Sequence, residues 1–132
     1  MTWFEAPGLM LPDLVALHGK WRGARTALIE GERRLTWAEF ERETARAAHG
    51  LGSLGVRAGD RVAVLMDNSL EMAILLFGIL RHGSVAVPLN VSVSDDAAAR
   101  GASRSTARIC WIAGTASRAM ISAARAPACS PT

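Results

Sequence analysis

The sequence predicts an α/β fold in which a β-hairpin is followed by parallel strand-helix-strand units with flanking helices. Residues 60–89 hold two short apolar runs rich in valine, separated by a longer apolar run that begins at a helix cap. Residues 26–36 hold two strand-like runs joined by Gly31-Glu32, and they lead into an amphipathic segment. Strands that are apolar on both faces are typical of a parallel sheet covered by helices, so we expect a right-handed parallel crossover.

Length and composition indicate a folded soluble domain. The chain has 132 residues, of which 50% are hydrophobic and 20% charged, enough for one hydrophobic core. The longest mostly apolar stretch, residues 72–80, is far shorter than the roughly 20 residues of a membrane-spanning helix. The first residues lack the basic start and long apolar run of a secretory signal, so we expect a cytoplasmic protein. Cys110 and Cys129 are then expected to be reduced, and their spacing predicts no metal site.

The first predicted element is a short amphipathic helix over residues 11–22. Leu14, Leu17 and Trp21 recur at three- and four-residue spacing. Pro12 suits the first turn of such a helix, because its missing N–H has no partner there in any case.

A hairpin and a long helix are expected next. Residues 26–30 and 33–36 are the predicted strands of the hairpin. Thr36 followed by Glu39 forms a capping box, which predicts that a helix starts there. This helix has an apolar face and a charged face, and three glycines are expected to end it: Gly50, Gly52 and Gly55.

The segment after these glycines has the order strand, helix, strand. Residues 60–66 are predicted to form a buried strand, residues 70–80 a largely buried helix, and residues 84–89 a second buried strand. Asn68 and Ser69 supply the helix cap. The two strands are expected to lie parallel to each other.

The composition changes at residue 96. Residues 1–96 contain all 12 acidic residues and every leucine and valine, and their net charge is −2. Residues 97–132 contain five arginines and no acid, for a net charge of +5. We therefore divide the chain into an α/β part, residues 1–96, and a tail rich in alanine, arginine and serine, residues 97–132. The arginines are spaced singly with Trp111 as their one aromatic neighbour, which favours a poorly specified terminal segment over a nucleic-acid-binding arm.

Predictions for the tail rest on weak patterns. Residues 97–104 lie where a helix is due, but they offer only alanine as apolar material. Residues 108–113 are predicted to form a strand and residues 115–125 a helix. Residues 127–132 are expected to be disordered.

Two sequence motifs have simple interpretations. Residues 50–55, Gly-Leu-Gly-Ser-Leu-Gly, match the dinucleotide-binding pattern. Here a helix enters and a strand leaves, the reverse of what phosphate binding at a helix N-terminus needs, so we interpret these glycines as a helix end. Residues 90–92 match a glycosylation sequon, which a cytoplasmic protein does not use.

No set of side chains has the spacing of a catalytic, cofactor-binding or metal site. The histidines lie near helix ends and are predicted to be caps or solvated: His18, His49 and His82. The carboxylates of the first long helix are predicted to form a solvated surface with basic neighbours: Glu39, Glu41 and Glu43. Asp95 and Asp96 are expected to cap the next segment, and the single lysine, Lys20, follows no phosphate-binding loop.

Residues 51–72 and 75–90 resemble the N-terminal region of AMP-forming acyl-CoA synthetases. These enzymes belong to the adenylate-forming family, which also includes luciferases and nonribosomal-peptide adenylation domains. The anchors of the resemblance are Gly59-Asp60-Arg61-Val62-Ala63-Val64, Asn68-Ser69 and Val87-Pro88-Leu89-Asn90. Together with the hairpin and the first long helix, the resemblance covers about residues 11–96.

The resemblance implies an enzyme that activates a carboxylic acid, such as a fatty acid, at the α-phosphate of ATP and passes the acyl group from AMP to coenzyme A. The cofactors of the full-length family are ATP, Mg and coenzyme A. The family's phosphate loop, its adenine- and ribose-binding motifs and its catalytic lysine do not occur in these 132 residues. No catalytic, cofactor-binding or metal-binding residue is therefore carried over. We expect an N-terminal fragment that takes no cofactor and is not catalytic alone.

Two other functions stay open from the sequence. A noncatalytic module that docks on a partner protein, such as a full-length synthetase, would expose an apolar patch, and such a surface would also allow self-association. A nucleic-acid binder would depend on the basic tail, although we expect neither a nucleic-acid partner nor a membrane span. The change at residue 96 also motivates the hypothesis of a reading-frame scar or a decayed gene end, which sequencing the locus would test.

Overall fold

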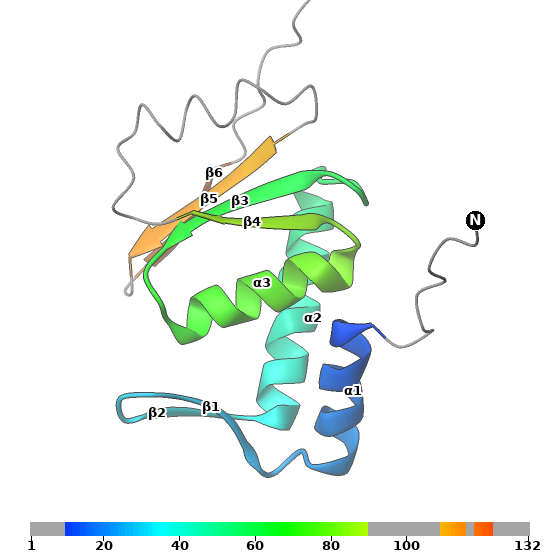
Figure 1. Cartoon of the computed structure of the whole chain (residues 1–132), viewed down its shortest axis with the longest axis vertical. Coiled ribbons are helices and arrows are strands. Elements are labelled where there is room, and N and C mark those ends of the chain that lie inside the picture. The colour runs from blue at the N-terminus through cyan, green and yellow to red at the C-terminus, as the bar shows by residue number, and fades with distance from the viewer. Residues whose placement is uncertain (1–9, 90–108, 116–117, 123–132) are drawn as a thin grey trace, which may run out of the picture.

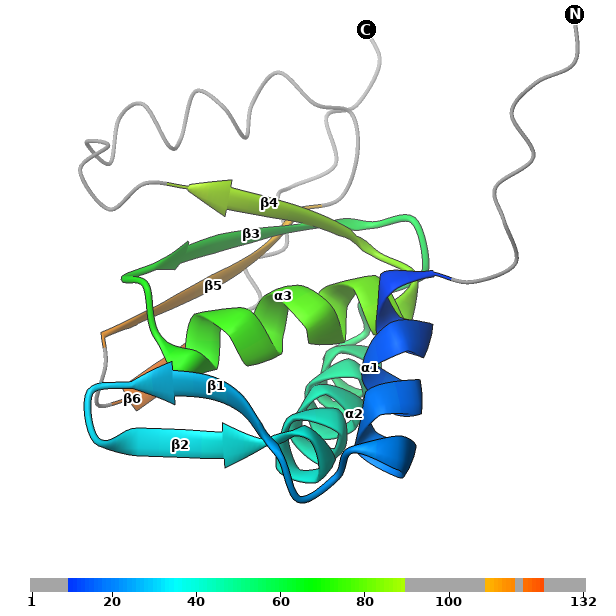
Figure 2. The same ribbon diagram turned by 60° about the horizontal axis from the view of Figure 1, so that its bottom comes forward.

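The computed structural model describes residues 10–89, 109–115 and 118–122, which form a layered α/β unit (Figure 1). A four-stranded sheet lies over helix α3, and a two-stranded hairpin lies on the other side of that helix (Figures 1 and 2). The elements are α1 (Leu11–Trp21), β1 (Thr26–Glu30), β2 (Arg33–Thr36), α2 (Trp37–Ser53), β3 (Arg61–Met66), α3 (Leu70–His82), β4 (Val85–Leu89), β5 (Ile109–Thr115) and β6 (Arg118–Ser122). The predicted α/β fold, with a hairpin before parallel strand-helix-strand units, is confirmed.

The hairpin forms where the sequence predicts it. Strands β1 and β2 pair antiparallel, with Glu30 opposite Arg33 and Ile29 opposite Arg34. Gly31 in the turn has a φ of +58°, a left-handed conformation that residues with a Cβ rarely adopt.

Helix α2 starts at the predicted capping box. Thr36 Oγ1 accepts a hydrogen bond from the Glu39 N–H at 3.3 Å, and Glu39 Oε2 accepts one from the Thr36 N–H at 2.8 Å. The bonds from Thr36 to the ionised carboxylate lower the pKa of Glu39. The helix ends at Ser53, and Gly55 turns the chain with a φ of +79°, so the predicted glycine end is confirmed there, while the two earlier glycines lie within the helix.

Helix α3 crosses α2 closely because a glycine lies at the crossing. A Cβ added to Gly78 would lie 2.6 Å from the Ala47 Cβ and 3.3 Å from the Thr44 carbonyl oxygen. At the start of α3, Ser69 Oγ accepts a hydrogen bond from the Met72 N–H at 3.2 Å, which confirms the predicted cap.

The sheet has the strand order β4-β3-β5-β6, and β3 is parallel to both of its neighbours. The predicted parallel arrangement of the two apolar strands is therefore confirmed. The predicted burial of the second strand is wrong, because β4 is at the edge of the sheet and Val85 is 48% exposed. Val62 and Val64 of β3 are fully buried. They form the core with side chains of both long helices: Leu51, Leu75 and Ile79.

The predicted helix over residues 115–125 is wrong. Residues 118–122 form β6, which pairs antiparallel with β5 so that Ile121 lies opposite Ile112. Alanine favours a helix locally, but a helix of this length is marginal in water without an apolar face to bury. The free edge of β5 instead pairs its backbone groups with those of β6. The strand predicted at 108–113 is confirmed as β5.

Some predictions lie outside the described residues: the helix at 97–104, the sequon at 90–92, the caps Asp95 and Asp96, Cys129, and the disordered end at 127–132. Strands β5 and β6 follow residue 96 in the chain and lie in the same sheet as β3 and β4. Among the described helices, none combines the length and the apolar character needed to cross a membrane.

Candidate functional site

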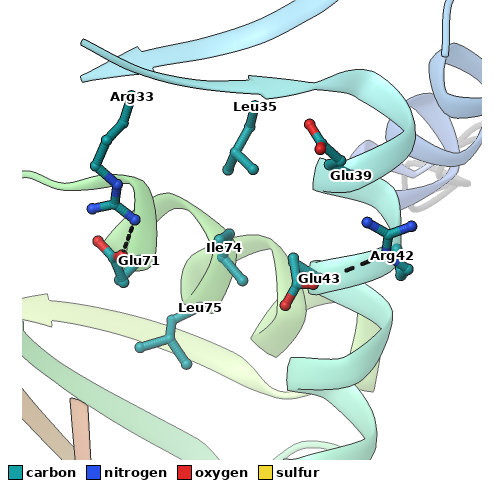
Figure 3. Close-up of a pocket in the computed structure, with 8 residues that line it drawn as sticks. All are labelled: Arg33, Leu35, Glu39, Arg42, Glu43, Glu71, Ile74 and Leu75. Atoms are coloured by element: carbon teal, nitrogen blue, oxygen red, sulfur yellow. Dashed lines mark hydrogen bonds and ion pairs between the residues drawn. The ribbon is translucent and has the colours of Figure 1, made fainter. Parts of the chain in front are cut away.

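A cavity of about 430 Å³ opens between the hairpin and helices α2 and α3 (Figure 3). Its lining combines charged side chains with an apolar surface from β2 and α3. The lining residues are Arg33, Leu35, Glu39, Arg42, Glu43, Glu71, Ile74 and Leu75.

An ion pair between Arg33 and Glu71 is the main polar contact of this cavity. Arg33 Nη2 lies 2.5 Å from Glu71 Oε1 (Figure 3). Arg33 Nη1 lies 3.0 Å from Glu30 Oε2. The hydrogen bond to Glu71 raises the pKa of Arg33, and the guanidinium holds the pKa of Glu71 below its ordinary value. The pair ties the hairpin to the first turn of α3.

The other charges of the cavity also serve the fold. Glu43 pairs with Arg46 at 3.2 Å and with Arg42 at 4.0 Å. Glu71 Oε2 is enclosed without a hydrogen-bond partner of standard geometry, at the N-terminal end of α3, where helix N–H groups favour a carboxylate. The lining offers neither a nucleophile nor a histidine, and no cluster of metal ligands occurs in the described part of the chain. We therefore interpret the cavity as a structural gap rather than a catalytic pocket.

The carboxyl edge of the parallel strands is a second candidate ligand site, because open α/β sheets bind ligands there. The ends of β3 and β4 lie side by side, since Leu65 is in register with Leu89. Asp67 and Asn68 follow β3 and are exposed, and residues 66–70 contain no lysine or arginine. One carboxylate and one amide do not fit a triphosphate with its Mg²⁺, which needs cationic groups and further oxygen ligands. Residues 66–70 alone therefore do not fit the cofactors that the resemblance implies.

His18 lies in the last turn of α1, near a helix end as predicted, and it is half-buried rather than fully solvated. Its ring lies against Trp37 of α2, with the ring centroids 4.6 Å apart. The two residues are far apart in the sequence, and neither pattern nor spacing signals their contact. His49 is exposed near the end of α2, as predicted.

His82 contacts a serine, but the direction of the hydrogen bond is opposite to the one that catalysis would need. Its Nδ1 lies 2.8 Å from Ser84 Oγ, and Ser84 Oγ donates a hydrogen bond to the Arg57 carbonyl oxygen at 3.2 Å. Because the hydroxyl proton is used by the carbonyl, Nδ1 is the donor to Oγ. A histidine that activated the serine would have to accept its proton. The contact instead links the end of α3, through Ser84, to Arg57 in the loop between α2 and β3.

The three carboxylates of α2 have three different roles. Glu39 caps the helix, and Glu43 pairs with basic neighbours on its own helix, as predicted. Glu41 instead pairs with Arg81 of α3 at 2.8 Å and joins the two long helices. Sequence reasoning missed this pair and the Arg33–Glu71 pair, whose members lie 40 and 38 residues apart. Opposite charge on neighbouring elements was the one available signal.

Comparisons with known proteins agree with the fold. The family model described as AMP-binding enzyme matches residues 17–130. The chain is 43% identical over 72 residues to a 3-hydroxybenzoate–CoA/4-hydroxybenzoate–CoA ligase of Thauera aromatica, a match that covers 54% of this chain and 14% of that protein. It is 43% identical over 61 residues to a long-chain-fatty-acid–CoA ligase of Mycobacterium tuberculosis, covering 46% of this chain and 12% of that protein.

Solved structures of similar proteins share the architecture. An inhibitor-bound N-terminal domain of FACL13 from Mycobacterium tuberculosis superposes with a TM-score of 0.70 at 29% identity, over 76% of this chain and 26% of that one. A protein described as a putative long-chain-fatty-acid CoA ligase from Rhodopseudomonas palustris gives a TM-score of 0.71 at 28% identity, over 78% of this chain and 26% of that one.

The match to the relatives is partial on their side. The aligned part of the chain spans 14% of the length of the Thauera ligase and 12% of that of the mycobacterial ligase. The family model, in contrast, matches most of this chain, and its elements occur in the order that the resemblance predicts. The chain belongs to the AMP-binding enzyme family and corresponds to a fragment of the family's members.

Proposed function

We propose that the chain is the N-terminal scaffold of a cytoplasmic, ATP-dependent, AMP-forming carboxylate–CoA ligase, and that it does not catalyse the reaction alone. Its role is to supply the first parallel strands and the helices packed on them. ATP, Mg²⁺ and coenzyme A would be cofactors of the whole enzyme, and the cavity between the hairpin and the helices takes no part in the chemistry.

The observation that carries this proposal is the identity shared with acid–CoA ligases over the residues that form the fold. The relatives named above act on hydroxybenzoates and on long-chain fatty acids. These acids share a carboxylate attached to an apolar body, so we propose that the substrate of the whole enzyme is of this class.

The side chains of the described residues support the proposal that the chain alone does not catalyse the reaction. Phosphoryl and adenylyl transfer depend on positioned cations that stabilise charge on the phosphate oxygens. The arginines of the cavity are engaged by Glu30, Glu43 and Glu71, and the carboxyl edge at residues 66–70 has no cation.

ATP–pyrophosphate exchange tests the proposal. The purified chain is assayed with 4-hydroxybenzoate and a long-chain fatty acid, and the full-length Thauera ligase serves as the positive control. We expect exchange at the level of the protein-free reaction, and exchange above it would refute the proposal.

A chimera tests the scaffold role. The aligned segment of the Thauera ligase is replaced by that of this chain, which we expect to preserve detectable ligase activity. The same chimera carrying Val64→Asp in the buried strand is the inactive control. A folded chimera without activity would count against the proposed role.

A further inference from the structure

The outward side of α1 is an apolar surface that nothing in the described residues covers. Helix α1 lies at the margin of the helical layer, with α2 and α3 on its inner side (Figures 1 and 2). On that inner side Val15 is buried and Gly19 allows close packing, since an added Cβ would lie 2.9 Å from the Glu41 Cβ. On the outer side Trp21 is 75% exposed and Leu14 43%.

The exposed apolar residues follow a heptad spacing. Met10, Leu14, Leu17 and Trp21 are separated by four, three and four residues, the spacing of the seam of a coiled coil. Met10, Leu14 and Trp21 are exposed, and Leu17 is half-buried. We call these four residues the α1 seam.

We propose that the α1 seam binds the α1 seam of a second copy of this chain, with the two helices antiparallel. An antiparallel pair places Leu14 against Leu17 of the other copy, and Trp21 against the flexible side chain of Met10. A parallel pair would instead force Trp21 against Trp21 and would align the two helix dipoles.

The charges beside the seam are complementary in the antiparallel arrangement only. Asp13 and Lys20 occupy equivalent positions one heptad apart and are both exposed. In an antiparallel pair, Asp13 of each helix faces Lys20 of the other, so the dimer contains two Asp13–Lys20 pairs. Lys20 makes no ion pair within the described residues, so it is available for this contact. The proposal does not depend on the proposed ligase function.

The contact is short, so the dimer should be weak. Stable interfaces bury more than about 1,000 Å², whereas a seam of three helical turns stays near or below that area. We expect a dissociation constant of roughly 100 µM.

Sedimentation velocity of the 132-residue chain at increasing concentration tests the proposal. We expect a shift from monomer to dimer that Trp21→Ser and Leu14→Ser each weaken at least about tenfold. Ile29→Ser, at a side chain of β1 that is 59% exposed, is the matched control and should leave the dissociation constant unchanged. Monomers at every concentration up to about 1 mM would overturn the proposal. An equal effect of Ile29→Ser would overturn it as well.

Charge reversal tests the antiparallel orientation. Lys20→Glu places Asp13 against Glu, and Asp13→Lys places Lys against Lys20, so each variant alone should dimerise about tenfold more weakly. An equimolar mixture restores two opposite pairs and should form the heterodimer. Because Asp13 Oδ2 also accepts a hydrogen bond from the Met10 N–H at 2.7 Å, Lys20→Glu is compared separately with Arg34→Glu on the hairpin. A mixture that associates no better than its components, or equal effects of Lys20→Glu and Arg34→Glu, would overturn the arrangement.

Discussion

The α2–α3 interface and the outer side of α1 are both made of apolar residues at helical spacing, but they differ in how they are completed. At the α2–α3 interface, Gly78 lets the helix backbones approach, and Glu41 pairs with Arg81 across the contact. The outer side of α1 has neither a close approach nor a charge partner within the described residues. Apolar residues at helical spacing therefore indicate only that one face of a helix is suited to burial. The small residues and charges around that face indicate which neighbouring element packs against it.

The largest loss of stability should come from truncating a buried side chain on the inner side of α3. Ile79 is fully buried in the core, whereas its neighbour Leu80 is 38% exposed. Ile79→Ala should lower the free energy of unfolding by about 3 kcal/mol, because it removes buried methylene groups and leaves a cavity. Leu80→Ala should cost less than about 1 kcal/mol. Urea denaturation measures both, and equal losses would contradict the core assignment.

The next effect concerns the helix crossing. Gly78→Ala adds a methyl group 2.6 Å from the Ala47 Cβ, so the helices must separate, which should cost about 2 kcal/mol. Gly50→Ala is the control, because a Cβ there meets nothing within 4 Å and alanine is the better helix former. We expect Gly50→Ala to raise the midpoint of thermal unfolding and Gly78→Ala to lower it. A gain in stability from Gly78→Ala would mean that the helices are not in close contact.

Acid should weaken the link between the hairpin and α3. The pKa of Glu71 is lowered from 4.5, chiefly by the hydrogen bond from Arg33, so its contribution to stability is present above that value and is lost as the pH falls through the folded-state pKa. Glu71→Gln should be less stable than the parent chain near pH 6 and should approach it near pH 3. Urea denaturation across this range measures the difference, which solvent screening keeps small. A difference that does not depend on pH would contradict the ion pair.

The smallest effect should come from the ion pair across the long helices. Glu41 and Arg81 are partly exposed, so Glu41→Gln should cost about 0.5 kcal/mol. A double-mutant cycle with Arg81→Gln isolates the coupling between the two side chains. A coupling near zero at low salt would mean that the crossing is held by packing alone.

Local signals in the sequence predicted most of the elements. Gly31 marks the hairpin turn, Thr36 with Glu39 marks the start of α2, and Ser69 marks the start of α3, because each acts on residues within one turn of itself. The valine-rich runs predicted the parallel pair, although only β3 is buried and β4 lies at the edge of the sheet.

Contacts between distant residues were not predictable in the same way. The strand β6 depends on the free edge of β5, which overrides the helix preference of an alanine-rich segment. The contacts of His18 with Trp37 and of Arg33 with Glu71 depend on how the helices and the hairpin pack, which no local pattern encodes. That the chain has no catalytic residue stays a prediction from its sequence.

Binding of nucleotide to the chain alone tests the scaffold proposal most directly. Titration calorimetry of the 132-residue chain with ATP and Mg²⁺ should show no saturable heat up to about 1 mM nucleotide, because Arg33 and Arg42 of the cavity are paired with carboxylates and residues 66–70 contain no lysine or arginine. Saturable binding with a dissociation constant below about 100 µM would contradict the account, since these residues would then hold the nucleotide without the rest of an enzyme.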